Sequence, residues 1–203
     1  MGFEPTYDGF ANHCLTAWLP HHDCAFVGPS GHFEPRTGTT QPLARQARPG
    51  RADRGRLPPM RVALGADEDL HLVTEVACAL EDRGHVVARY GAAAGKKEPW
   101  ADTAVAVAES VARGEHDMGV VCCWTGTGVS IAANKVPGVR AALCADAQTA
   151  RGARRWNDAN VLALSLRATA PEVAREILEA WFGEPYGGTE DASLGVIAAR
   201  EKR

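Results

Sequence analysis

The sequence predicts an α/β fold, in which a five-stranded parallel sheet carries helices on both faces. From Met60 onward, short apolar runs alternate five times with longer segments whose apolar residues recur at helical spacing. This alternation is typical of strand–helix–strand units. Glycine or proline stands at several junctions, where it ends or begins a helix. Because connections between parallel strands are right-handed, the expected arrangement is a doubly wound sheet.

Three strands and two helices are expected between residues 61 and 123. The apolar run at 61–65 predicts the first strand, and the helical spacing that follows it ends at Gly84. The segment 85–90 predicts the second strand. Residues 100–113 are rich in alanine and valine and predict a helix, and 117–123 predict the third strand. A glycine-containing loop follows this strand.

Two further strands, 139–144 and 160–165, are expected among three helices. These helices span about 129–135, 147–156 and 171–182, and the last begins at a proline whose missing N–H does no harm there. The whole pattern predicts a Rossmann-like sheet with the flavodoxin-type strand order. Ligands of such sheets bind beyond the carboxyl ends of the strands, where the strand order reverses.

The first 59 residues differ in composition from the rest. They hold 8 of the 12 prolines and neither lysine nor isoleucine. A segment of this composition cannot bury enough apolar surface to offset the entropy of ordering the chain. We therefore expect 1–59 to be a disordered extension. Residues 60–203 form the expected domain, with a C-terminal tail from about 184.

Two features of the extension bear on its origin and on metal binding. The segment 2–20 resembles the peptides that arise when a transfer-RNA gene is translated, which implies that the native start is Met60. Two cysteines, two histidines and an aspartate lie between residues 14 and 24, but their spacing fits no closed four-ligand zinc pattern. No metal site is therefore expected.

The composition disfavours several classes of function. The formal net charge is −3, so we expect no basic field of the kind that binds nucleic acid generically. No apolar run approaches the roughly 20 residues needed to span a bilayer. The N-terminus lacks a basic start followed by an apolar stretch. We expect a cytoplasmic protein with no nucleic-acid or membrane partner.

The loop from Cys123 to Gly128 is the first candidate site. It enters a helix, so its backbone amides can hold a phosphate or a reaction oxyanion, although a tight strand–helix turn also needs glycine. A helix N-terminus favours the thiolate of a cysteine beside it. Cys123 is thus either a base or nucleophile or a buried structural cysteine, the role expected for Cys78, Cys122 and Cys144.

Asp67 follows the first predicted strand and is the second candidate. Its carboxylate belongs to the same edge of the sheet as the Cys123 loop. A short acidic residue before a helix is also a common N-cap. Both interpretations of Asp67 stay open from position alone.

Residues 123–135, CWTGTGVSIAANK, resemble a loop of the ribose-5-phosphate isomerase B family, which includes the galactose-6-phosphate isomerase subunits. Residues 138–143 and 157–162 extend the resemblance, which covers 60 to about 188. It implies a doubly wound five-stranded sheet and a homodimer, or a dimer of dimers, with active sites shared between subunits. It also implies aldose–ketose interconversion of a small sugar or sugar phosphate through an enediolate, without metal or cofactor.

The resemblance implies roles residue by residue. Cys123 matches the base of the cysteine-type members, because the glutamate of the other members falls at Val129. Thr125 matches a threonine that assists ring opening, and Asp67 matches an aspartate that contacts substrate hydroxyls. Gly126, Thr127 and Gly128 match the loop that stabilises the enediolate oxygen. Asn157 matches an asparagine from the neighbouring subunit, and Arg167 matches a phosphate-region arginine. Asn134 and Lys135 match residues that hold either the loop and dimer or the substrate.

Five positions depart from the family pattern. Glu68 replaces a histidine after the first strand, Trp156 replaces the ring-opening histidine, and Trp124 replaces a loop glycine. The phosphate-binding arginine pair falls at about Thr189 and Ser193. Loss of the ring-opening histidine at Trp156 predicts a substrate that is open-chain or opens unaided. Loss of the phosphate ligands, together with a carboxylate at position 68 that repels phosphate, predicts a sugar that is unphosphorylated or differently charged. The two tryptophans narrow the pocket, stack on a sugar face, or simply pack.

These residues favour an aldose–ketose isomerase with altered substrate choice, since the base, the loop and Asp67 are all present. The alternative is a non-catalytic sugar-binding or regulatory relative that keeps the fold. The specific loop sequence at residues 123–135 disfavours a flavodoxin-like nucleotide-binding or receiver domain.

Overall fold

The computed structural model describes residues 58–201. The expectations for the extension 1–59, including disorder, a native start at Met60 and the cysteine–histidine cluster, fall almost wholly outside these residues. Within the described part of the chain, no helix combines the length and apolar character needed to cross a bilayer.

Five parallel strands form one sheet in the order β2-β1-β3-β5-β4. This confirms the predicted five-stranded doubly wound sheet. The register aligns the carboxyl ends of the central strands, because Ala66 pairs with Cys122 and Cys123 pairs with Ser165. The strands are β1 (Arg61–Ala66), β2 (Val86–Gly91), β3 (Met118–Cys123), β4 (Ala141–Leu143) and β5 (Val161–Ser165).

The flavodoxin-type order was wrong for the last two strands, because β5 lies between β3 and β4. Burial explains the exchange. All five residues of β5 are buried, whereas β4 has three residues and none is buried. An apolar run that is covered on both faces is most stable in the centre of a sheet, and a short, partly exposed strand suits the edge.

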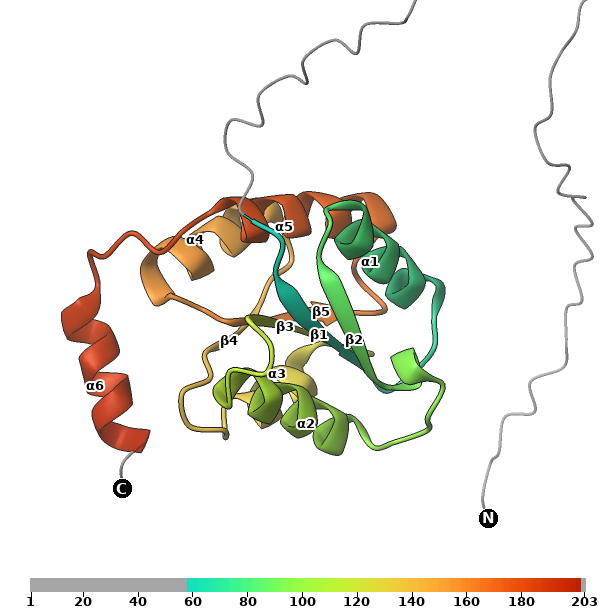
Figure 1. Ribbon diagram of the computed structural model, residues 1–203, viewed down its shortest axis with the longest axis horizontal. Helices are drawn as coiled ribbons and strands as arrows, with labels where there is room; N and C mark the ends of the chain where they lie inside the picture. The colour runs from blue at the N-terminus through green and yellow to red at the C-terminus, as the bar shows by residue number, and fades with distance from the viewer. Residues whose placement is uncertain (1–57, 202–203) are drawn as a thin grey trace, which may run out of the picture. The chain divides into compact units, whose positions relative to one another are not determined.

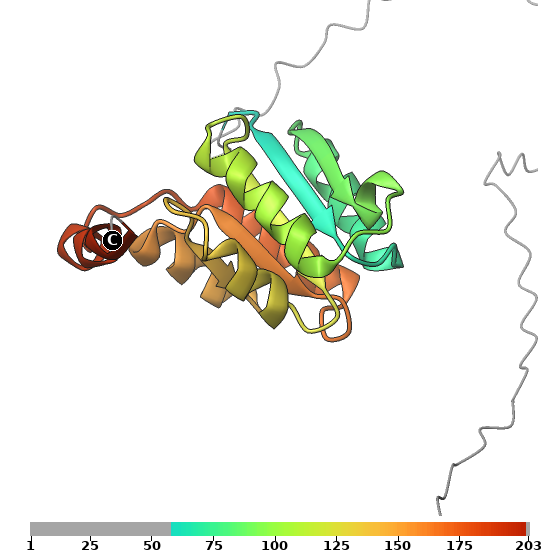
Figure 2. The same ribbon diagram turned by 90° about the horizontal axis from the view of Figure 1, so that it is seen from below.

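Helices cover both faces of the sheet, as predicted (Figure 1). One face carries α1 (His71–Asp82), α4 (Ala147–Asn157) and α5 (Pro171–Gly183). The other carries α2 (Trp100–Ala112) and α3 (Thr127–Ala133), which lie nearest the viewer in Figure 2. Right-handed crossovers produce this division, since chain segments moving in opposite directions along the sheet place their helices on opposite faces.

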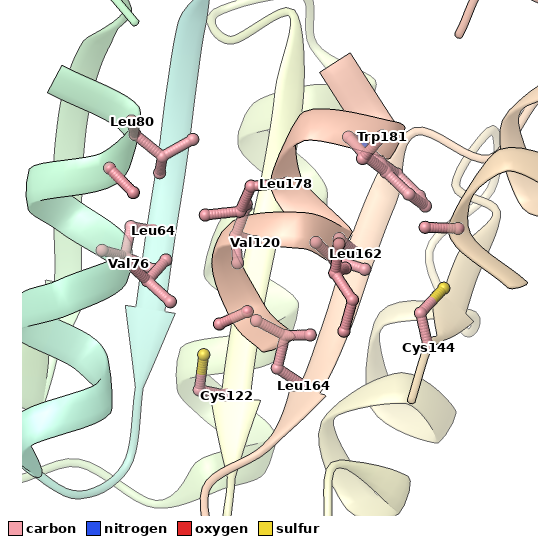
Figure 3. Close-up of a cluster of buried hydrophobic side chains, with 14 of the residues drawn as sticks. Leu64, Val76, Leu80, Val120, Cys122, Cys144, Leu162, Leu164, Leu178 and Trp181 are labelled. Atoms are coloured by element: carbon pink, nitrogen blue, oxygen red, sulfur yellow. The ribbon is translucent and has the colours of Figure 1, made fainter. Parts of the chain in front are cut away.

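The larger core fills the space between the sheet and the helices α1, α4 and α5. Figure 3 shows Leu64 of the sheet beside Val76 of α1, and Val120 and Leu162 of the sheet beside Leu178 of α5. All five are fully buried. A second cluster lies under α2 and α3. Burial on both faces makes the three central strands a rigid base for the loops at their ends.

Two short elements were not predicted. A 3-10 turn, η1 (Ala92–Ala94), follows β2, and α6 (Asp191–Glu201) forms within the expected tail. In Figures 1 and 2, α6 lies beyond α4 at the side of the molecule. None of its residues is buried, and Gly195 interrupts its sequence, so it gave no apolar helical stripe to detect.

Candidate active site

The strand order reverses between β1 and β3. From β1 the chain passes to β2 on one side, and from β3 it passes to β4 on the other. A crevice is expected at the carboxyl ends of such a pair. Because Ala66 pairs with Cys122, the next residues, Asp67 and Cys123, are brought together at this point.

Cys123 and Cys122 point to opposite faces of the sheet. Cys122 is fully buried against α1 and α5 (Figure 3), and this burial, with the nearby charges of Cys123 and Asp67, raises the pKa of its thiol to about 12. Cys122 therefore stays a neutral core residue, as predicted. Cys123 ends β3 with 6% of its surface exposed, on the side of α2 and α3. Cys123 is thus the thiol at the switch point.

Of the other two cysteines, Cys144 is buried, which confirms its structural role. Burial and the charge of Asp146 raise the pKa of the Cys144 thiol to about 12. The prediction for Cys78 was wrong, because Cys78 is exposed on α1.

The loop after Cys123 turns sharply into α3. Gly126 caps the helix with φ 74°, a left-handed conformation, and its N–H donates to the Cys123 carbonyl over 3.2 Å. The helix begins at Thr127, two residues earlier than the predicted 129. The first amides of a helix have no acceptor within it, and those of Thr127 and Gly128 lie in the loop that the sequence singled out. The Thr125 and Thr127 hydroxyls share a 2.7 Å hydrogen bond.

The β5–α5 loop is joined to the Cys123 loop by backbone bonds. The Cys123 carbonyl also accepts from the Leu166 N–H at 2.9 Å, and the Trp124 carbonyl accepts from the Ser165 hydroxyl at 3.0 Å and the Arg167 N–H at 3.1 Å. Arg167 is exposed. These bonds place the backbone of Arg167 beside the loop, and its role as a phosphate-region arginine stays what the resemblance implies.

Two tryptophans lie at this edge of the sheet. Trp124 is held by its backbone and leaves its indole 53% exposed. Trp100, at the start of α2, lies so close to Gly128 that a Cβ there would be 3.1 Å from its ring. Sequence reasoning missed Trp100. The available signal was an aromatic residue at the start of the helix after β2, at the ligand-binding edge.

Asp67 is not an N-cap. Helix α1 begins four residues later, at His71, and its cap residue Leu70 makes no side-chain capping bond. The Asp67 Oδ1 is buried without a hydrogen-bond partner. Burial raises the pKa of the Asp67 carboxyl, and the exposed Glu68 beside it acts in the same direction. An unpartnered buried carboxylate oxygen is suited to accept a hydrogen bond from a bound hydroxyl.

Replacing Asp67 with asparagine is expected to change the pH dependence of stability. A raised pKa means that the folded protein binds this proton more tightly than the unfolded chain, so its contribution to stability falls as pH rises from the ordinary value of 3.8 through the raised value. Asp67→Asn removes this loss. The variant should therefore gain stability relative to the parent as the pH rises from below 3.8 through the raised pKa of Asp67, measured by denaturant unfolding.

The same variant is expected to lose activity. A hydrogen bond to a charged group contributes about 1.5–3 kcal/mol, so kcat/KM should fall about 10- to 100-fold. Asp69→Asn, at an exposed carboxylate two residues on, is the matched control. Parallel stability curves for the parent and Asp67→Asn across this pH range would contradict the role of burial.

Trp156 and Asn157 do not join Cys123 within one copy of the chain. Both residues lie at the end of α4, which runs antiparallel to the strands. They therefore lie at the edge formed by the amino ends of the strands, opposite the carboxyl ends where Cys123 lies. A groove of about 730 Å³ lies at that edge, and its lining includes Arg140, Asn157 and Ile197. The predicted site is thus split: Asp67, Glu68, the loop and Arg167 at one edge, the α4 terminus at the other.

Two further predicted positions belong to the C-terminal segment. Thr189 precedes α6, and Ser193 lies on it with its hydroxyl donating to Glu190 at 3.1 Å. Neither is near β3 in the chain fold, since α6 lies beyond α4 (Figure 1). Among residues 58–201, no group of three or more His, Cys, Asp or Glu side chains is placed to hold a metal ion.

Comparison with known proteins gives concordant matches. A profile of the family described as Ribose/Galactose Isomerase matches residues 62–195. Ribose-5-phosphate isomerase B of Escherichia coli is 38% identical over 145 residues, which are 70% of this chain and 97% of that protein. D-erythrulose-4-phosphate isomerase of Pectobacterium atrosepticum is 37% identical over 149 residues, 70% and 98% of the two chains. The structure of ribose-5-phosphate isomerase B from Clostridium thermocellum superposes with a TM-score of 0.67 at 39% identity, covering 70% of this chain and 98% of that one.

Proposed function

Because this chain belongs to the Ribose/Galactose Isomerase family, we propose that it interconverts an aldose and a ketose by proton transfer through an enediolate. The observation that carries the proposal is the meeting of Cys123 and Asp67 at the switch point, beside the amides that begin α3. The chemistry needs a base, an oxyanion site and an acceptor for substrate hydroxyls. In this proposal, Cys123, the α3 amides and Asp67 fill these three roles.

In the proposed reaction, the Cys123 thiolate removes a proton from the carbon next to the substrate carbonyl. The resulting enediolate is stabilised by the amides of Thr127 and Gly128, and the proton returns to the neighbouring carbon. A second proton moves in the opposite sense between the two oxygens, so the aldose and ketose have the same atoms. Asp67 accepts a bond from a substrate hydroxyl, and Thr125 donates toward the substrate oxygens.

The proposed enzyme is a homodimer with two shared sites. Asn157 and Trp156 lie too far along α4 to reach Cys123 of their own copy, whereas the family resemblance gives Asn157 to the neighbouring subunit. In the proposed dimer, the α4 terminus of one copy completes the Cys123 site of the other. A two-fold axis makes both sites identical.

The replaced residues favour a short, open-chain substrate. Trp156 stands where the family places the ring-opening histidine, so a sugar that must be opened is a poor substrate. A four-carbon sugar phosphorylated on its last oxygen has no hydroxyl left to close a five-membered ring. One relative is named for such a substrate, and for this reason we propose a phosphorylated sugar in place of the unphosphorylated one that Glu68 led us to expect. We also propose that the half-exposed Trp124, the residue after Cys123, narrows the substrate space and disfavours longer sugars.

A substrate panel in deuterium oxide tests this proposal. We expect erythrose 4-phosphate and erythrulose 4-phosphate to be interconverted with a kcat/KM at least about 10-fold above that for ribose 5-phosphate, the scale on which pockets discriminate by one carbon. Erythrose and ribose without phosphate complete the panel. Saturable binding with no deuterium uptake from any sugar would instead establish a non-catalytic sugar-binding relative.

A further inference from the structure

Helix α4 ends at a residue in an unusual backbone conformation. Asp158 follows Asn157 with φ 45° and ψ 42°, in the left-handed region. It is the one non-glycine residue with positive φ among residues 58–201. L-residues other than glycine adopt this region at a cost and keep it only where the surroundings enforce it. The contacts around Asp158 therefore stabilise a backbone conformation that the residue would otherwise leave.

Arg140 provides most of those contacts. Its Nε donates to the carbonyls of Asn157 at 3.1 Å and Asp158 at 2.9 Å, and an Nη donates to the Asp158 carboxylate at 2.7 Å. The planar guanidinium thus binds the backbone and the side chain of one turn together. A lysine has neither the plane nor the number of donors for this arrangement.

The Arg140 backbone is fixed in turn. Its N–H donates to the Asn160 side-chain oxygen at 2.8 Å, and its carbonyl accepts from the Asn160 N–H at 3.1 Å. From the other side, the buried Arg154 donates to the Ala159 carbonyl at 2.5 Å. The turn after α4 is therefore held by two arginines from different parts of the chain.

This turn holds exposed residues in one position. Asn157 is exposed, and Trp156 is 49% exposed with its ring against Gly152 of the preceding helical turn. An exposed helix end needs no such support for folding, since helix termini commonly fray into solvent. The support is explained if the two side chains must meet a ligand at a defined place.

We propose that Arg140 and Asp158 are positioning residues, which hold the Trp156–Asn157 helix end for the active site of a second copy of the chain. The inference rests on the proposed shared-site isomerase and adds what sets the geometry of the part supplied by the partner. In this proposal Arg140 does not act on the substrate directly. It acts through the carbonyl of Asn157 and the backbone of Asp158.

Single variants test the positioning role. Arg140→Ala should lower kcat/KM about 100-fold, the cost of a displacement of about 1 Å at a reacting site. Arg140→Lys should not rescue it, because the charge returns without the planar fork. Asp158→Asn tolerates the left-handed conformation and removes only the carboxylate charge, which pairs with Arg140 at 2.7 Å and with Arg154 at 3.5 Å, so kcat/KM should fall about 10-fold, mainly from the charge-assisted hydrogen bond to Arg140. If Arg140→Ala folds poorly, Asp158→Asn provides the test of the positioning role in its place.

Arg113→Ala is the matched control. Arg113 is itself the C-cap residue of α2, and its guanidinium binds the carboxylates of Glu109 and Glu115. Its variant should keep parental kcat/KM. Loss of activity in Arg113→Ala as large as in Arg140→Ala would show that any broken arginine cap has this effect, and would overturn the specific role.

Subunit mixing tests the action in trans. Cys123→Ser and Arg140→Ala carry different tags, are unfolded and refolded together, and the mixed dimer is isolated through both tags. One of its two sites has both defects and the other has neither. The isolated mixed dimer should therefore show about half of parental activity, and an unfractionated equal mixture about a quarter.

The outcomes separate this inference from the proposed function. Full activity in Cys123→Ser alone would refute the isomerase mechanism. If both single variants are inactive and their isolated mixed dimer is also inactive, the isomerase mechanism stands and positioning in trans is refuted. Failure to obtain any mixed dimer, with the protein monomeric by light scattering yet active, would refute it as well.

Discussion

Replacing Cys123 with serine is expected to lower kcat/KM about 1,000-fold, within the range of losses seen when a general base is removed. Serine nearly matches cysteine in size, so the 6% exposed position at the end of β3 should tolerate it. The serine hydroxyl does not ionise near neutral pH, so the proton on the substrate carbon is left without a base. Turnover and solvent-deuterium uptake should fall together.

Cys78→Ser is the matched control for this change. Cys78 is an exposed cysteine on α1, and its variant should keep parental activity and stability. Circular dichroism and thermal unfolding of Cys123→Ser should match the parent. Deuterium uptake within about threefold of the parent in Cys123→Ser, far short of the effect of a lost base, would assign the base to another group.

Gly126→Ala is expected to reduce the free energy of unfolding by about 2–5 kcal/mol. Two costs combine. The backbone at φ 74° disfavours an L side chain by about 1–2 kcal/mol. The new methyl group would also lie 2.5 Å from Leu143 Cδ1 and 2.9 Å from the Leu164 carbonyl carbon, and overpacking of this kind costs about 1–3 kcal/mol. Since β5 backbone cannot move aside, the loop must shift instead.

Gly84→Ala separates these two costs. Gly84 has a similar φ of 83°, but a Cβ there would meet nothing within 4 Å. Its variant should lose only about 1–2 kcal/mol, the conformational part. Urea unfolding of both variants measures the difference. Equal losses would mean that the contact with β5 and Leu143 does not constrain the Cys123 loop. Gly126→Ala should in addition lose activity, because the loop carries the proposed oxyanion amides.

The meeting of Asp67 and Cys123 could be predicted because it depends on one local rule. Each residue follows a recognisable apolar strand, and the carboxyl ends of parallel strands share one edge. The position of β4 depends on a comparison that periodicity does not contain, namely which of two strands is covered more completely. Three half-exposed residues at β4 and five buried ones at β5 decide it.

Other parts of the site depend on contacts between distant residues. Arg140 binds the end of α4, 17 and 18 residues further along the chain, and its role follows from a side chain meeting backbone carbonyls, which leaves no sequence motif. The contact of Trp100 with Gly128 is of the same kind. Asn157 was assigned to the neighbouring subunit by resemblance, and its place at the far edge of the sheet agrees with that assignment.

Helix α6 contributes no buried residue to the core. Thr189 and Ser193, where the resemblance places the arginine pair, lie just before it and on it. Substitutions there leave the folding of the sheet almost untouched, since exposed positions away from packed contacts rarely change stability by more than about 0.5 kcal/mol. If Thr189 and Ser193 lie in the phosphate region, as the resemblance implies, substrate preference can be changed by mutating the tail without compensating changes in the core that supports Cys123.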